Sequence, residues 1–219
     1  MKKQSRVLGG LRYDVCCEAS MEDMVPVLFG FLEGLPHARM RDGFRLEMGF
    51  SVFTFRRRRG GYQLRCPDYR GDPLGKTTED LTLALWIMLS QTRLLQRCGL
   101  SPTPCRYDEP VAVARGALEQ PLVSLRRMPE LGGSGWCLDA LRQNEAGELE
   151  PVPGAEYEAL RAGELPRLRP GLVQALLCPR GCLAVFRGEE LVELLNEEDE
   201  SLLPEAPADC SPSIMETSE

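Results

Sequence analysis

The spacing of apolar residues predicts a strand and a helix at the start of the chain. Residues 11–19 form an apolar stretch that is typical of a β-strand. Residues 25–35 then carry apolar side chains at the i, i+3, i+4 and i+7 positions of an amphipathic helix. Ser20, with Asp23 three residues later, resembles a capping box, and Pro36 ends the helical pattern.

A period of two follows and predicts a β-hairpin. Apolar and other residues alternate from Phe44 to Val52, and the alternation slips at Phe53, which indicates a bulge or bend. We interpret residues 56–61 as the turn and residues 62–66 as the returning strand.

The next predicted element is a long helix. Thr77 or Thr78 is the expected cap, apolar residues cover much of the circumference, and the helix is expected to end near Cys98, before Gly99. This helix is the predicted buried centre of the first half. Residues 101–110 are proline-rich and are interpreted as a connector.

The second half contains shorter elements. A helical or irregular segment is expected to run to Glu119, and the Gly-rich segment before Trp136 is interpreted as a turn. The remaining predicted elements are a strand at 122–128, a short helix at 157–162, a helix from Pro170 to Leu177 and a hairpin at 182–195.

Together these patterns predict an α+β fold of two small packed units with antiparallel sheets and a long central helix. The expected units are an N-terminal α+β unit at 1–110 and a C-terminal α+β unit at 111–196. Residues 197–219 lose all periodicity and carry eight acids without a lysine or arginine. We interpret them as a disordered acidic tail.

Charge and cysteine usage narrow the class of protein. The formal net charge is −7, but the acids of 197–219 account for it, so the rest of the chain is close to neutral and gives no reason to expect a nucleic-acid partner. No apolar run approaches the roughly 18 residues of a membrane span. Nine cysteines without a pairing pattern suggest reduced thiols, and we expect a cytoplasmic protein.

The sequence contains no recognisable catalytic or metal-binding pattern. His37 is the only histidine, so nothing pairs a Ser or Cys nucleophile with a base. Cys178 and Cys182 have no second pair at zinc-ligand spacing. Residues 71–77 are similar to a phosphate-binding loop but are one residue short between the glycines. We therefore expect no enzyme activity, no cofactor and no metal.

The candidate partner-binding residues lie in predicted turns, where side chains can project. They are the basic run at the hairpin tip, the tryptophan after the Gly-rich turn and the acidic 145–150 loop: Arg56, Arg57, Arg58, Arg59, Trp136, Glu148 and Glu150. A solvated turn is the simpler interpretation of the arginines, and a core position is the simpler interpretation of Trp136.

The order of several short motifs resembles a known family. The motifs are Asp42-Gly43-Phe44 with Leu46-x-Met48-Gly49-Phe50-Ser51, Cys66-Pro67-Asp68, Gln91 in the long helix, Leu125-x-Arg127, Ser134-Gly135-Trp136, Tyr157 with Leu160, Arg169-Pro170 and Leu177-Cys178-Pro179-Arg180-Gly181. Over roughly residues 8–196 the chain resembles bacterial proteins with an immunity-protein-33 domain, from polymorphic-toxin and type VI secretion neighbourhoods. Cys66 and Cys137-Leu138-Asp139 depart from the expected pattern.

The resemblance implies an immunity protein, an antitoxin that binds a cognate toxin or secreted effector and neutralises it by stoichiometric protein–protein inhibition. It implies no catalytic residues. Two other functions remain open. A secretion chaperone or adaptor for an effector fits the composition equally well, and a thiol-dependent enzyme would reveal itself by one hyper-reactive cysteine.

Overall fold

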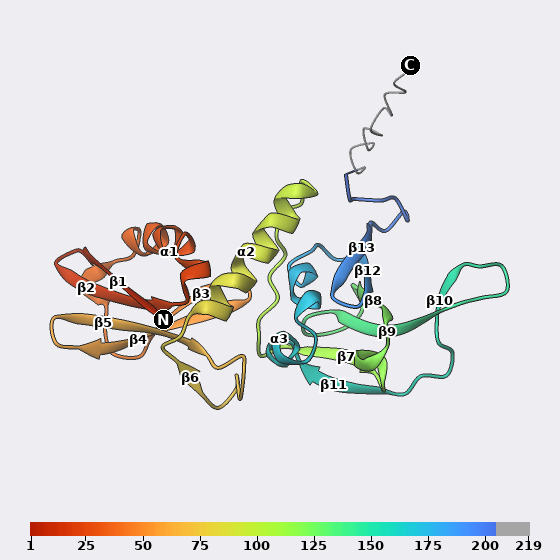
Figure 1. Cartoon of the computed structure of the whole chain (residues 1–219), viewed down its shortest axis with the longest axis horizontal. Helices are drawn as coiled ribbons and strands as arrows, with labels where there is room; N and C mark the ends of the chain where they lie inside the picture. The colour runs from red at the N-terminus through yellow and green to blue at the C-terminus, as the bar shows by residue number, and fades with distance from the viewer. Residues whose placement is uncertain (205–219) are drawn as a thin grey trace, which may run out of the picture.

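The structure, a computed structural model, describes residues 1–204 and belongs to the α+β class. Two mixed β-sheets lie side by side, with helix α2 (Thr82–Arg97) between them (Figure 1). The first sheet is built from residues before α2 and the second from residues after it. Among the helices of residues 1–204, none has the length and apolarity needed to cross a membrane.

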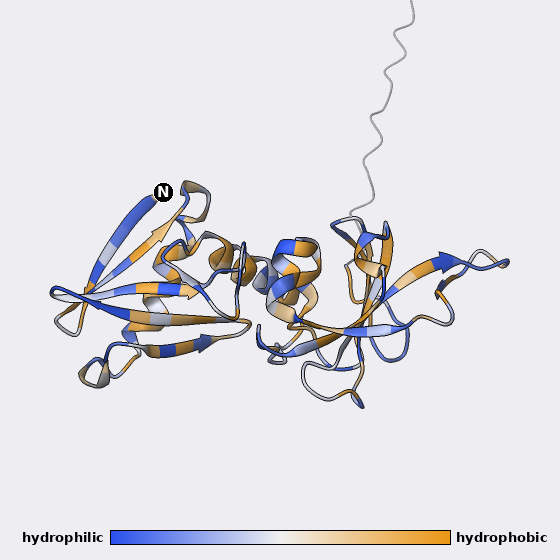
Figure 2. Ribbon diagram, turned by 90° about the horizontal axis from the view of Figure 1, so that it is seen from below, coloured by the Kyte–Doolittle hydropathy of each residue, from blue (hydrophilic) through white to orange (hydrophobic). Residues whose placement is uncertain are grey.

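The first sheet has the strand order β1-β2-β5-β4-β3, and the short β6 pairs antiparallel with the end of β5. The sequence pattern did not predict β1, which forms one edge of the sheet. Its residues are mostly polar and exposed, and Figure 2 colours much of the strand as hydrophilic. Strands β3 and β4 replace the single bent strand that the alternation predicted. The strands are β1 (Lys2–Leu8), β2 (Leu11–Cys17), β3 (Phe44–Met48), β4 (Ser51–Arg58), β5 (Gly61–Pro67) and β6 (Thr77–Thr78).

Two helices pack with this sheet. Helix α1 (Met24–Glu33) follows a short 3-10 turn, and its buried side holds Val25, Leu28, Phe29 and Leu32. Helix α2 begins later than predicted, because the residues expected to cap it form β6 instead. The carboxylate of Asp80 accepts the backbone N–H of Thr82 at 3.0 Å and provides the polar contact at the start of α2.

The second sheet has the order β11-β7-β9-β8-β12-β13, and β10 pairs with β9. Two predictions were wrong here: the segment before Glu119 contains strand β7, and residues 157–161 form strand β11 rather than a helix. The predicted strand at 122–128 and the hairpin at 182–195 are confirmed. The strands are β7 (Pro110–Ala114), β8 (Leu122–Arg127), β9 (Trp136–Gln143), β10 (Leu149–Pro151), β11 (Tyr157–Arg161), β12 (Leu183–Arg187) and β13 (Glu190–Leu195).

The sequence analysis predicted antiparallel sheets, but both sheets are mixed. Strand β2 runs parallel to β5, and β7 runs parallel to β9. The first parallel pair is short: its register covers only Arg12–Asp14 against Gly61–Gln63. Beyond it the strands separate, and the amide of Gln63 donates to the carbonyl oxygen of Asp14 at 3.2 Å.

One continuous core joins the two halves. Helix α2 packs on the first sheet and also against the 3-10 helix η5 (Pro170–Ala175) of the second half. The buried amide of Gln91 in α2 donates to the carbonyl oxygen of Val173 in η5 at 3.0 Å. Because this bond lies in an apolar setting, it fixes the position of α2 relative to the second half.

The ordered body extends beyond Asn196, where the sequence pattern had placed the start of a disordered tail. The N–H of Leu202 donates to the carbonyl oxygen of Leu194 at 2.7 Å, and Ser201 forms a bridge with Leu195. Leu202 and Leu203 pack against the core. The remainder of the predicted tail, residues 205–219, lies outside the described residues.

Candidate functional site: an apolar groove beside helix α1

The exposed side of α1 carries no charged or hydrogen-bonding side chain until the last residue of the helix. Its exposed positions are Pro26, Val27, Gly30 and Phe31, followed by Glu33 at the end. Val27 is 46% exposed and Phe31 is 57% exposed. The spacing predicted the buried side of α1 correctly, but a surface helix normally places polar residues on its solvent side, and α1 does not. Exposed contiguous apolar surface of this kind typically marks an interaction site.

This face of α1 borders a groove of about 870 Å³. The groove is bounded by α1, by the end of β3 with the turn that follows it, and by the C-terminal half of α2. Three methionines lie among its apolar walls, and methionine adapts its shape to different ligands because its side chain is unbranched. The lining residues are Met24, Val27, Phe31, Leu46, Glu47, Met48, Gly49, Met88, Leu89, Gln91, Thr92, Leu95, Gln96, Gly99, Leu100, Pro102 and Leu177.

The polar groups of the groove are few and are already engaged in part. Glu47 is the only charged residue among those that line it, and its carboxylate lies 3.5 Å from the guanidinium of Arg106. The amide of Gln91 is used in the bond to η5. A groove with these walls offers apolar contact area and no pair of titratable groups for acid–base chemistry.

The predicted arginine run does not form a free basic tip. Arg56, Arg57 and Arg58 lie in strand β4, and the turn itself is formed by Arg59 and Gly60. Asp42 accepts from the guanidinium of Arg56 at 3.1 Å.

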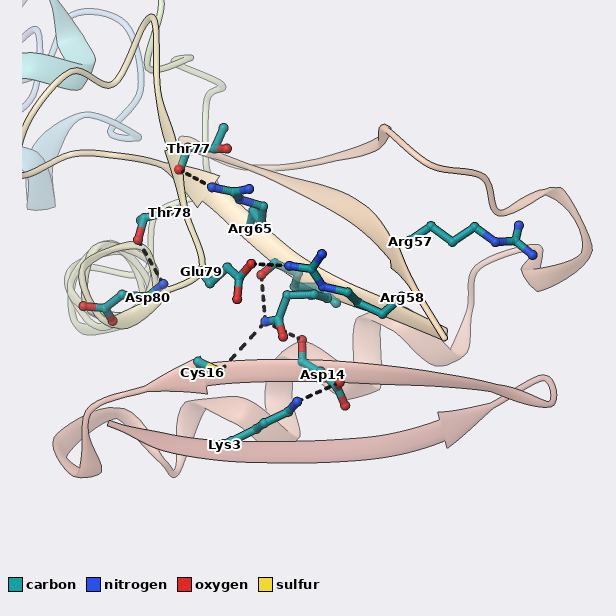
Figure 3. A network of polar contacts seen from close by, with 12 residues as sticks. Lys3, Asp14, Cys16, Arg57, Arg58, Arg65, Thr77, Thr78, Glu79 and Asp80 are labelled. Carbon is teal, nitrogen blue, oxygen red and sulfur yellow. Dashed lines mark hydrogen bonds and ion pairs between the residues drawn. The ribbon is translucent and has the colours of Figure 1, made fainter. Parts of the chain in front are cut away.

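Two members of the run differ in what surrounds them. The guanidinium of Arg58 lies 2.8 Å from the carboxylate of Glu79, whereas Arg57 points away from this network (Figure 3). Both side chains are exposed, as is Arg59. The run is therefore split between ion pairs along the strand and arginines that face solvent.

Trp136 is not a surface anchor. Its side chain is 1% exposed, and its indole N–H donates to the carbonyl oxygen of Leu176 at 3.0 Å. Trp136 opens strand β9 on the core side of the second sheet, opposite Arg127 of β8. The Gly-rich turn before it leads the chain directly into the core, so the tryptophan can contact a partner only if the fold opens.

The two candidate acids of the predicted 145–150 loop lie at the β9–β10 hairpin, where Glu148 is exposed and Glu150 is half-exposed. Glu148 accepts from the amide of Asn144 at 3.2 Å, and Glu150 pairs with Arg142 at 2.7 Å. Both contacts lie within the hairpin. The two acids lie apart from the groove, on an extension of the second sheet (Figure 1).

A second polar cluster lies on the first sheet around Asp14 (Figure 3). The Asp14 side chain is almost fully buried, and its carboxylate lies 3.0 Å from the Lys3 ammonium and 3.1 Å from the Arg12 guanidinium. The Ser5 hydroxyl donates to it at 2.6 Å. Burial alone would raise the pKa of Asp14, but these three groups outweigh it and hold that pKa below its usual value.

Three buried cysteines are unsuited to nucleophilic chemistry. Burial raises the pKa of Cys105 and of Cys178 to about 12. Burial and the charge of Asp139 raise the pKa of Cys137 to about 12 as well. A thiol with such a pKa is protonated near neutral pH and reacts slowly.

The other candidate sites also have structural roles. In the loop that is similar to a phosphate-binding loop, the Asp72 carboxylate accepts the N–H groups of Leu74 at 3.2 Å and Gly75 at 2.8 Å. The amides that would hold a phosphate are thus used within the loop. His37 bonds to the hydroxyl of Tyr13 at 2.8 Å, and residues 1–204 hold no group of three His, Cys, Asp or Glu side chains placed to bind a metal.

The sequence did not point to the groove. Its one detectable signal was the composition of α1, whose ten residues contain only one polar side chain, Glu33. That signal indicates a helix that is apolar all round, which is as typical of a fully buried helix as of a binding surface. Comparison of the chain with protein-family models, with curated proteins and with solved structures finds no match.

Proposed function

We propose that this protein works by binding a partner protein in the groove between α1, β3 and α2. The observation that carries the proposal is the apolar exposed face of α1, with Val27 and Phe31 projecting beside a groove of about 870 Å³. Covering such a face removes apolar area from water, at roughly 25 cal/mol per Å². Methionine-lined grooves of this kind suit the apolar face of a partner segment.

The partner that we propose is a cognate toxin or secreted effector, and the role is that of an immunity protein. The resemblance to immunity-protein-33 domain proteins supports the identity of the partner, and the groove supplies a surface through which stoichiometric inhibition can occur. The scarcity of titratable groups in the groove supports binding rather than catalysis. We further propose that the protein acts in the cytoplasm.

A second candidate function is that of a secretion chaperone or adaptor. The same groove favours it, because a chaperone shields an apolar segment of its client before export, and an adaptable methionine-lined surface accepts such segments. The two functions differ in outcome. An immunity protein abolishes the activity of the folded toxin, whereas an adaptor binds the effector and leaves that activity intact.

The test compares Phe31→Asp with Leu74→Asp in the full chain. Both side chains are more than half exposed, but Leu74 lies in the loop after β5, away from the residues that line the groove. We expect both variants to melt within a few degrees of the wild type, since exposed substitutions change stability by about 0.5 kcal/mol. Phe31→Asp should weaken calorimetric binding to the toxin or effector encoded next to this gene, and Leu74→Asp should not. Equal binding by both variants would remove the groove from the proposal.

Protection of cells that express the toxin separates the two functions. If wild type protects and Phe31→Asp does not, the immunity role stands. If wild type binds the effector through the groove without reducing its activity, the adaptor role replaces it.

A further inference from the structure

Strand β3 forms one edge of the first sheet and has only β4 beside it in that sheet. Apart from its pairing with β4, the only backbone bond of β3 among residues 1–204 runs from the N–H of Phe44 to the carbonyl oxygen of Arg41, at 3.1 Å. The strand has no proline, and its register with β4 has no shift. A free edge of this kind offers N–H and C=O groups for pairing with another strand.

The two faces of β3 differ in chemistry. Side chains alternate along a strand, so Phe44, Leu46 and Met48 share one face, and Arg45 and Glu47 share the other. Phe44 packs against the core, and Leu46 and Met48 line the groove. Arg45 and Glu47 are both exposed, and Glu47 also borders the groove. The open edge therefore presents an apolar row beside a row with one cation and one anion.

The other three strands that end the two sheets are β1, β11 and β13, and their charges oppose pairing with a second copy. Strand β1 carries three cations and no acid, so two copies would bring like charges together. Strand β13 carries Glu190 and Glu193 without a cation, its register has a bulge, and residues 201–202 bond along its end. In β11, Glu158 and Arg161 are three residues apart and so lie on opposite faces.

The two charges of β3 are not neutralised within the chain. Among residues 1–204, Arg45 forms no ion pair. Glu47 lies 3.5 Å from the guanidinium of Arg106, but that guanidinium is closer to the carboxylate of Asp108, at 2.9 Å. Arg45 and Glu47 can therefore each take a further partner of opposite charge.

We infer that two copies of this chain pair through their β3 strands, antiparallel and about a two-fold axis at Leu46. Such an axis is normal to the sheet and places residues at equal distances from Leu46 opposite each other. Arg45 of each copy then lies opposite Glu47 of the other, and Phe44 lies opposite Met48. Opposite charges and apolar side chains at directly facing positions stabilise a strand pair.

The pairing joins the two first sheets into one. Because the axis is normal to the sheet, the grooves of both copies lie on the same side and meet at the seam between the two β3 strands, where Leu46 and Met48 line them. The inference goes beyond the proposed function, because it needs no toxin or effector.

The test is sedimentation equilibrium of the full-length protein alone, across about 1–200 μM, because a short strand pair gives a small interface and a concentration-dependent dimer. Arg45→Glu places acids opposite each other, and Glu47→Arg places arginines opposite each other. Each variant should raise the dissociation constant of the dimer at least about tenfold, less at high salt, while its melting temperature stays close to that of the wild type. The control is Glu156→Arg, at an exposed position of the second half, which should leave the dimer intact.

Two rescue experiments test the antiparallel register. An equimolar mixture of Arg45→Glu and Glu47→Arg chains should form a heterodimer, because each acid of one strand then lies opposite an arginine of the other. The double variant, which carries both substitutions in one chain, should dimerise like the wild type. Restoration in both experiments requires positions 45 and 47 to face each other across the axis.

Other results overturn the inference. A wild type that stays monomeric over the whole range has no such interface. A dimer that neither single variant weakens is held by another surface. A dimer that both weaken, but that the mixture and the double variant do not restore, is not paired in this register. None of these measurements includes a toxin or effector, so they leave the groove proposal to be decided by Phe31→Asp.

Discussion

The guanidinium of Arg127 lies over the indole ring of Trp136, with 5.4 Å between the guanidinium carbon and the ring centroid. Both side chains are 1% exposed. No carboxylate accompanies this buried cation among its hydrogen bonds; it donates instead to backbone carbonyls. The acceptors are the oxygens of Thr103, Pro104, Ser134 and Cys178. Arg127 thereby ties the connector, the Gly-rich turn and the segment after η5 to one point.

We predict that Arg127→Met destabilises the protein by about 3 kcal/mol or more. The substitution keeps much of the apolar stem but leaves four carbonyls without this donor, two of them in buried bonds and two in part-buried ones. Each unsatisfied buried group costs roughly 1–3 kcal/mol, and water can recover part of the cost at the part-buried ones. Urea unfolding measures the change. The control is Arg126→Met, at the neighbouring exposed position of β8, which should change stability by less than about 0.5 kcal/mol. Similar stabilities for the two variants would show that the carbonyls find other donors.

We predict that the Asp14 cluster stabilises the fold above about pH 4 and stops doing so in acid. The pKa of Asp14 is lower in the folded state than in the unfolded chain. Its contribution is therefore complete above the unfolded value of about 3.9 and is lost as pH falls through the lower folded value.

The variant Asp14→Asn tests this. It cannot pair with Lys3 or Arg12, so it should lose about 2 kcal/mol at pH 7, the size of one or two charged hydrogen bonds. The difference from wild type should shrink as pH falls below about 4. Glu190→Gln, at an exposed position of β13, is the control and should follow the wild type throughout. A gap that stays constant down to pH 2 would assign the loss to packing rather than to charge.

The sequence predicted best where a single pattern decided the structure. The hairpin at 182–195 has two strands around a predicted turn at Arg187-Gly188, and the structure forms this hairpin with the turn one residue later, at 188–189. The prediction of a short helix at 157–162 was wrong. Tyr157 and Leu160 have helical spacing, but residues 157–161 pair with β7 and form a strand. Pairing energy between distant strands does not show in local spacing, and it overrides weak propensity.

The prediction of partner-binding residues from the sequence was weak for a related reason. Turn residues were chosen because turns project from the surface, yet Trp136 enters the core at the first residue of β9. Conversely, the spacing identified the buried side of α1 but gave no role to Phe31, which the structure leaves 57% exposed. Whether apolar residues on the outer side of a helix are covered by another element is a tertiary property, and local spacing does not contain it.

We predict that the buried thiols react far more slowly in the folded protein than in the unfolded chain. With a pKa of about 12, Cys105 and Cys178 hold a much smaller thiolate fraction at pH 7.5 than an ordinary thiol of pKa about 8.5. Iodoacetamide labelling followed by peptide mass spectrometry should show native rates at least about a hundredfold lower than in urea. A cysteine that reacts faster in the native state would instead support the alternative function of a thiol-dependent enzyme.

The last prediction concerns residues 197–204, which the sequence had assigned to the tail. A chain that ends at Asn196 should melt roughly 3–8 °C below one that ends at Pro204, because it loses the backbone bond of Leu202 to Leu194, the bridge of Ser201 and the contacts of two half-buried leucines. Together these are worth about 1–2 kcal/mol. Differential scanning calorimetry measures the difference, and Leu202→Ala in the full chain checks the side-chain share. Equal melting temperatures would mean that the acids of 197–200, by their mutual repulsion, offset everything that the segment gains by packing.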